Sequence, residues 1–325
     1  MSQRARYNGL VAALLTPVLM GAAPIFGKLA IHSGLDPFTL AALRTCLAAA
    51  LLWIVYLLFF RQYIYIFPAG LLSTAVVGAV NGFGSLLYYN GLLMLDNASL
   101  SQLLNMLYVI FTMLLVRMYG QKLSALSVIR AGLALVAVYL LTAWGQANTT
   151  IHWIGVALMI GSAFTYALHV VVSQRAMFEM PAPTMALYAL TWMAVTVLIA
   201  RVAYGTFLPL TTQPALPEGW LYVIGLTAVT ALSRVTLFSG VRNIGSLQTI
   251  LLNVAEIGVT LLAAGLWLKE SMTVVQWAGV GGLIFSVLLS RWDDGLKDLA
   301  YRPLSMLGLP KRIPPFSDPT DPNAS

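Results

Sequence analysis

Two charged residues, Arg234 and Glu256, lie inside long apolar stretches of the sequence. Arg234 lies within residues 219–241 and Glu256 within residues 243–268, and Gly245 lies eleven positions from each of them. The short link around Gly245 makes the two stretches an antiparallel helical hairpin. With a rise of about 1.5 Å per residue, both side chains reach nearly the same depth. Charged groups in membrane segments usually face one another or a water-filled path. The pattern therefore predicts either a structural ion pair or a charged element of a transport pathway.

Other polar and aromatic residues in the apolar stretches are candidates for the same pathway. The asparagines either bond a substrate or join helices, and the tyrosines either line a site for an organic ligand or form an interfacial belt. Arg44 either reaches the site or extends to the membrane surface. His169 either relays protons or is a packed residue. The candidate substrate-binding or coupling residues are Glu256, Arg234, Arg44, Asn105, Asn253, Asn81, Tyr88, Tyr166 and His169.

The composition indicates an integral membrane protein. Apolar residues make up 59% of the 325 residues and charged residues 9%, and the mean hydropathy is +0.84. A soluble domain carries about 25% charged residues. The net charge of +7 does not indicate nucleic acid, because the basic residues gather in particular loops and tails, as membrane orientation requires. The lipid bilayer is the expected partner, and the single cysteine, Cys46, excludes an intrachain disulfide.

Ten apolar stretches have the length of about 20 residues that a membrane-spanning helix needs. Backbone groups in lipid must be bonded within the protein, and these stretches are too long and too uniformly apolar for barrel strands. The expected fold class is therefore all-α, with ten transmembrane helices. They are predicted at residues 8–31, 37–60, 69–95, 98–116, 125–144, 153–174, 182–204, 219–241, 246–268 and 273–290.

The loops between these stretches differ in charge from one side of the membrane to the other. Basic residues such as Arg61, Arg117, Arg175 and Arg242 fall on one side together with both ends of the chain, whereas the opposite loops carry few. Because loops rich in Lys and Arg stay in the cytoplasm, we expect cytoplasmic N and C termini in the plasma (cell inner) membrane. Residues 293–325, rich in proline and mixed charge, are expected to form a disordered cytoplasmic tail.

Short similar segments recur about halfway along the chain. Each half holds five apolar stretches, an odd number, so the second half enters the membrane from the opposite side. Such inverted repeats place a transporter's substrate site near the midplane, between the halves. We expect a first repeat over residues 1–144 and a second over residues 145–292. The similar pairs are NGLVA at 8–12 with IGVA at 154–157, DPFT at 36–39 with APT at 182–184, and QLLN at 102–105 with ILLN at 250–253.

Three segments carry a resemblance to a known family. They are GAAPIFGK at 21–28, PFTLAALR at 37–44, and LKESMT at 268–273, which is followed by Gly279. With Glu256 at the acidic position of the ninth helix, the chain resembles the EamA-type family of the drug/metabolite transporter superfamily over about residues 8–290. The resemblance implies secondary transport, usually outward, of amino acids, other metabolites or drugs.

The chain also departs from the pattern of that family. Leu190 in the seventh helix stands where the second helix has Arg44, and the usual prolines of the fourth and ninth helices are Val109 and Ile257. The first repeat has Gln121-Lys122 where a Glu-Arg pair is expected. The family resemblance therefore indicates the substrate only broadly.

The expected function is secondary transport, which explains the charged residues at the interface between the repeats. Outward movement of an amino acid or similar amphipathic compound is favoured. A proton or another ion is the candidate for coupling. The alternative is a membrane-embedded enzyme that acts on a lipid-linked substrate, which usually needs several acids or a metal in an interfacial loop. No cofactor, metal or enzymatic activity is expected, because no ATP-binding loop is complete and His32, His152 and His169 lack metal-ligand spacing.

Overall fold

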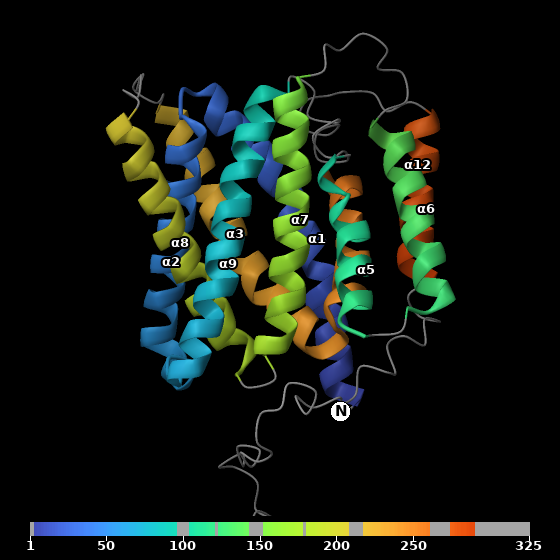
Figure 1. Cartoon of the computed structure of the whole chain (residues 1–325), viewed down its shortest axis with the longest axis horizontal. Coiled ribbons are helices and arrows are strands. Elements are labelled where there is room, and N and C mark those ends of the chain that lie inside the picture. Colours follow the sequence, from blue (N-terminus) through green and yellow to red (C-terminus); the bar gives the residue numbers. More distant parts are fainter. Residues whose placement is uncertain are drawn as a thin grey trace, which may run out of the picture.

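The computed structural model describes residues 3–95, 104–120, 123–142, 152–177, 180–207, 217–260 and 274–289, and these residues form the all-helical membrane protein that the sequence predicts (Figure 1). The first half contains α1 (Gln3–His32), α2 (Pro37–Phe59), the short 3-10 helix η1 (Arg61–Tyr63), α3 (Pro68–Met94), α5 (Tyr108–Met118) and α6 (Ala125–Thr142). The second half contains α7 (Trp153–Ala176), α8 (Ala182–Phe207), α9 (Pro217–Ile244), α10 (Ser246–Asn253), a helical segment over residues 255–260, and α12 (Val274–Leu288). The predicted tail, residues 293–325, lies outside the described residues.

Local sequence signals set the helix boundaries. Asp36 caps α2, because its carboxylate accepts hydrogen bonds from the backbone N–H groups of Phe38 and Thr39 at 2.9 and 3.1 Å. Pro37 occupies the first turn of α2, where its missing N–H leaves no bond unmade. Gly245 separates α9 from α10 with a φ of 87°, a left-handed conformation that favours glycine. The predicted hairpin between α9 and α10 is confirmed at this link.

Within the part of the chain that the structure describes, six helices are long and apolar enough to cross a membrane, namely α1, α2, α3, α7, α8 and α9. The fourth and ninth predicted helices differ from continuous spans. A turn at Met106 and Leu107 precedes α5, and a turn at Val254 separates α10 from residues 255–260. At both turns the backbone makes tight bonds to the third residue back, from Val109 to Met106 and from Ile257 to Val254. These turns lie 148 residues apart, so they occupy equivalent places in the two repeats.

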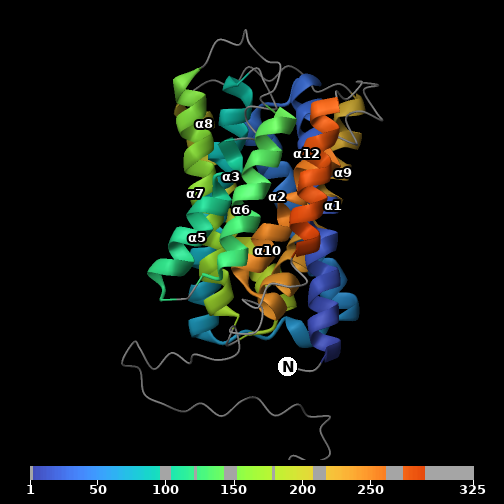
Figure 2. The same ribbon diagram turned by 90° about the vertical axis from the view of Figure 1, so that its right-hand side faces the viewer.

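The helix contacts follow the symmetry of two repeats. In the first half α3 packs against α7 and α8, and in the second half the equivalent α9 packs against α1 and α2. The equivalent pairs α2 with α8 and α6 with α12 pack across the symmetry axis. Figures 1 and 2 show α6 and α12 together at one edge of the bundle, away from α2 and α8. The two halves therefore meet along the middle of the molecule, as inverted repeats do.

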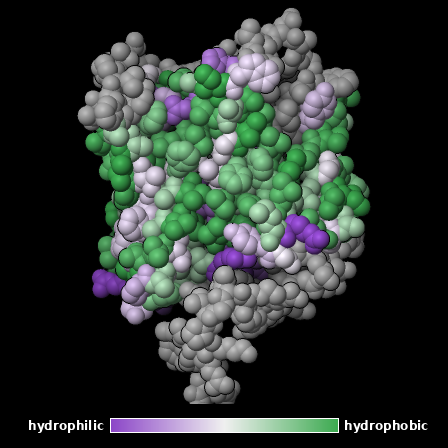
Figure 3. Space-filling model, in the orientation of Figure 1, coloured by the Kyte–Doolittle hydropathy of each residue, from purple (hydrophilic) through white to green (hydrophobic). Residues whose placement is uncertain are grey.

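The outer surface is apolar and the interior holds polar side chains. Leu72, Phe59 and Ile199 are 69%, 73% and 64% exposed, as lipid-facing residues of a membrane protein are. The face seen in Figure 3 is mostly hydrophobic, and its hydrophilic residues lie mainly toward the upper and lower ends. Because lipid does not drive apolar side chains inward, the buried charged and polar residues mark the places where function is expected.

Candidate substrate cavity

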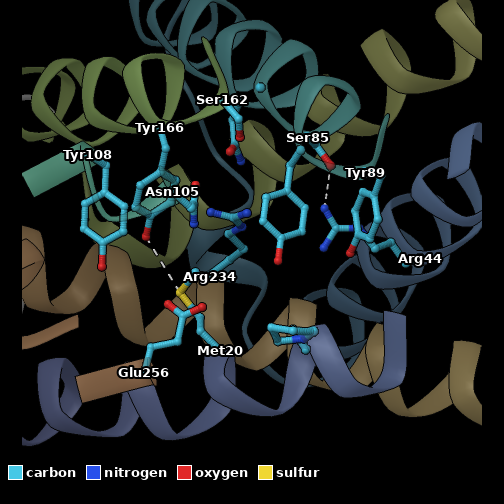
Figure 4. A pocket seen from close by; sticks show the side chains of 15 residues that line it. Met20, Arg44, Ser85, Tyr89, Asn105, Tyr108, Ser162, Tyr166, Arg234 and Glu256 are labelled. Carbon is cyan, nitrogen blue, oxygen red and sulfur yellow. Dashed lines mark hydrogen bonds between the residues drawn. The ribbon is translucent and has the colours of Figure 1, made fainter. Parts of the chain in front are cut away.

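A cavity of about 100 Å³ lies between the two halves. Its walls come from α1, α2, α3, α7, α9 and the segment 255–260. Asn105, which lies before the turn that precedes α5, and Tyr108, the first residue of α5, complete them. Figure 4 shows polar side chains converging on it from these elements. The lining residues are Met20, Ala23, Pro24, Arg44, Asn81, Gly84, Ser85, Tyr88, Tyr89, Asn105, Tyr108, Ser162, Tyr166, Arg234 and Glu256.

Arg234 and Glu256 both line this cavity, as their equal distances from Gly245 predict. Both residues are buried, at 8% and 7% exposed. In the described structure no ion pair or hydrogen bond joins the two side chains, and Nε and Nη1 of Arg234 have no hydrogen-bond partner. The direct ion pair that the spacing allowed is therefore absent from this conformation. The two opposite charges face a shared space in which a ligand could contact both.

Arg44 turns inward to the cavity rather than to the membrane surface. Its Nη2 donates a hydrogen bond to Oγ of Ser85 at 2.6 Å, and its Nη1 lies 3.4 Å from Oγ1 of Thr230. The guanidinium carbon lies 4.8 Å from the centre of the Tyr89 ring, a cation–π distance. These contacts hold a second cation at the side of the cavity opposite Glu256 (Figure 4).

The side of the cavity around Glu256 contains hydroxyl and amide groups. Tyr108 and Tyr166 pack edge to face with ring centres 5.1 Å apart, and the buried Tyr108 hydroxyl has no hydrogen-bond partner. Nδ2 of Asn253 donates to the Tyr166 hydroxyl at 3.3 Å. Asn105 lines the cavity directly. Asn105 and Asn253 precede the two helix turns and are equivalent in the two repeats, but Asn105 lines the cavity whereas Asn253 contacts the lining residue Tyr166.

Seven of the nine residues proposed from the sequence line the cavity, and two lie behind it. Asn253 is fully buried and reaches the cavity only through Tyr166. His169 is also fully buried, and its ring centre lies 6.0 Å from that of Tyr166 and 5.6 Å from that of Phe238. Asn81 lines the cavity while its Nδ2 lies 3.0 Å from Sδ of Met193. The position of His169 fits the packed residue better than a direct ligand of the substrate.

Sequence reasoning left several lining residues out of the proposed site. Tyr108 is the clearest, because it lies 148 residues before Glu256 and is therefore its counterpart in the first repeat. The offset between the LLN segments could have found it. Ser85 carries no such signal, and only its hydrogen bond with the inward-turned Arg44 shows its part in the site.

Comparisons with known proteins agree with this fold. The model of the EamA-like transporter family matches residues 7–143 and again residues 153–292. The chain therefore belongs to the EamA-like transporter family, within the drug/metabolite transporter superfamily. It is a membrane transporter, with a lipid bilayer and a small-molecule substrate as its partners. This assignment favours transport over the membrane-embedded enzyme considered from the sequence.

Two individual proteins show the same relationship. The chain is 23% identical over 286 residues to the uncharacterized transporter YcbK of Bacillus subtilis (strain 168), which covers 86% of this chain and 91% of that protein. It also matches a crystal structure of a protein with a TM-score of 0.72 and 15% identity, over 93% of this chain and 100% of the other. The structural likeness shows the fold alone.

Proposed function

We propose that this membrane transporter is a secondary carrier that moves an amino acid or similar amphipathic metabolite out of the cell. The observation that supports the proposal most is the cavity between the repeats, where buried Arg234 and Glu256 face one space without bonding each other. A carboxylate of the substrate binds Arg234, and its ammonium group binds Glu256. Each hydrogen bond to a charged group contributes about 1.5–3 kcal/mol, so the zwitterion is recognised by both ends.

Transport proceeds by alternating access, in which one repeat rocks against the other around the cavity. The helix turns next to Asn105 and Asn253 lie beside the cavity and are places where the helices bend during this motion. Both termini face the cytoplasm of a cell whose plasma membrane holds the protein. The repeats extend over residues 1–144 and 145–292. The charge asymmetry of the loops supports this orientation.

Glu256 also serves as the coupling group. It is the only carboxylate among the lining residues that the structure describes, and coupling to a proton or another cation usually requires a group whose charge can change. Binding of the ion and of the substrate at one acid would make the two events compete. Exchange of an outward-moving substrate for an inward-moving proton then follows from the site itself.

Ligand-dependent thermal unfolding of the purified protein tests this function. A ligand that binds the folded state raises the melting temperature by mass action, so a panel of amino acids and related metabolites identifies the substrate. We expect a zwitterionic compound to stabilise the wild type and to lose its effect in Arg234→Gln. Arg61→Gln is the matched control, because Arg61 is exposed and bonds only the carbonyl of Leu57 among the contacts described. Equal stabilisation of all three proteins would contradict binding in this cavity.

A further inference from the structure

The described wall of the cavity carries more positive than negative charge. Arg44, Arg234 and Glu256 line it, and each is more than nine-tenths buried, with 8%, 8% and 7% exposed. Among the lining residues that the structure describes, two guanidinium groups therefore face a single carboxylate. A buried charge without a partner is unfavourable, and buried cations are normally paired with an anion. A simple zwitterion, with one negative and one positive group, leaves one of the two arginines without such a partner.

The two arginines line the same cavity, and Arg44 reaches the helix that carries Arg234. Nη1 of Arg44 lies 3.4 Å from Oγ1 of Thr230, and Thr230 lies four residues before Arg234 on α9. Residues four apart lie on the same helix face, about 6 Å apart along the axis. The Arg44 guanidinium thus contacts α9 one helical turn before the residue that carries the second guanidinium, Arg234. In the view of Figure 4 the Arg234 side chain lies between those of Glu256 and Arg44.

Both arginines retain hydrogen-bond donors. Nε and Nη1 of Arg234 have no partner. Arg44 bonds Ser85 and contacts Thr230 through its two terminal nitrogens, which leaves other N–H groups among the five donors of a guanidinium. Arginine suits carboxylates in particular, because its planar group can bond both oxygens. The site can therefore receive two separate acidic groups.

We propose that the substrate is an amino acid with a second acidic group. Its ammonium group binds Glu256, its α-carboxylate binds Arg234, and its side-chain carboxylate binds Arg44. In such a molecule the ammonium group and the α-carboxylate share the α-carbon, and the second carboxylate lies further along the side chain, toward Arg44. This inference rests on the proposed transport function, and it narrows the substrate from amphipathic compounds in general to anionic amino acids.

Matched pairs of ligands test the inference on the wild-type protein. Glutamate and glutamine, and aspartate and asparagine, differ in one charge at nearly constant shape. Losing one charged hydrogen-bond contact is worth at least about 1.4 kcal/mol, which is tenfold in affinity. We expect each acid to bind at least about tenfold more tightly than its amide, as measured by titration calorimetry. Glutarate, which lacks the ammonium group, is expected to bind more weakly than glutamate.

Variants of Arg44 test whether this residue causes the preference for the acid over its amide. Arg44→Gln should bind glutamate no better than glutamine, and Arg44→Lys, which keeps the charge, should retain part of the difference. If Arg44→Gln does not fold, the wild-type pairs and Arg44→Lys still decide the question. Amides that bind as tightly as the acids would overturn the inference while leaving the transport of zwitterions intact. Failure of every amino acid to bind or to be transported would instead refute the proposed function itself.

Discussion

Gly21→Ala tests whether the approach of α1 to the segment 255–260 sets the position of Glu256. A Cβ at Gly21 would lie 2.8 Å from the carbonyl oxygen of Glu256 and 2.8 Å from Cβ of Val259. Real side chains essentially never come that close, and the first of these contacts is to backbone, so the segment must shift. Thr260 strengthens the same contact, because its hydroxyl donates a hydrogen bond to the Gly21 carbonyl at 2.8 Å.

The expected loss of stability is about 1–3 kcal/mol, the usual range for overpacking. Gly132→Ala is the matched control, since a Cβ at Gly132 meets nothing within 4 Å. Alanine is also favoured over glycine inside a helix by about 1 kcal/mol. The control should therefore be neutral or more stable, whereas Gly21→Ala should unfold at lower temperature and transport less. Thermal unfolding and flux in proteoliposomes measure both effects. If Gly21→Ala matched Gly132→Ala in both assays, the close approach would not exist.

Two further predictions concern orientation and charge. With Cys46→Ala as background, a single cysteine at Thr212 should be labelled from outside by an impermeant reagent, and one at Ser2 should not. Labelling of Ser2 from outside would contradict the predicted orientation. Replacing Arg234 or Glu256 by Ala should destabilise the protein, and the double variant should lose less than the sum of the single losses. At an effective dielectric constant of about 20, two charges 4 Å apart interact by about 4 kcal/mol, which bounds the coupling because no ion pair forms. Strictly additive losses in thermal unfolding would show that the two charges do not interact.

Much of the site could be predicted because it depends only on how deep each residue lies along its membrane-spanning helix. Arg234 and Glu256 lie at equal distances from Gly245, so the hairpin brings both to the cavity even though a turn at Val254 interrupts its second arm. The sequence also predicts that the asparagines before the two turns are equivalent, since Asn105 and Asn253 end the same LLN segment. Helix length and repeat offset therefore carried these predictions.

The remaining features depend on packing and on side-chain direction. The fourth and ninth apolar stretches give no sign of the turns at Met106 and Val254. The hydropathy of a sequence indicates which segments lie in lipid, but it does not indicate how their backbone groups are hydrogen-bonded. The same limit applies to Arg44, whose position two turns into α2 allowed either direction until its contacts with Ser85 and Tyr89 were known. His169 was a candidate because it is an ionisable residue in a membrane span, but its side chain packs behind the cavity and does not line it.

Gradient-driven flux of the identified substrate in proteoliposomes tests most directly whether the charged cavity performs coupled transport. Glu256→Gln keeps the size of the side chain and its capacity for hydrogen bonds but removes its charge. The wild type should transport faster with a proton gradient than without it, and Glu256→Gln should remain folded, as thermal unfolding shows, while losing that dependence. Wild-type-like, gradient-dependent flux in Glu256→Gln would contradict coupling at Glu256.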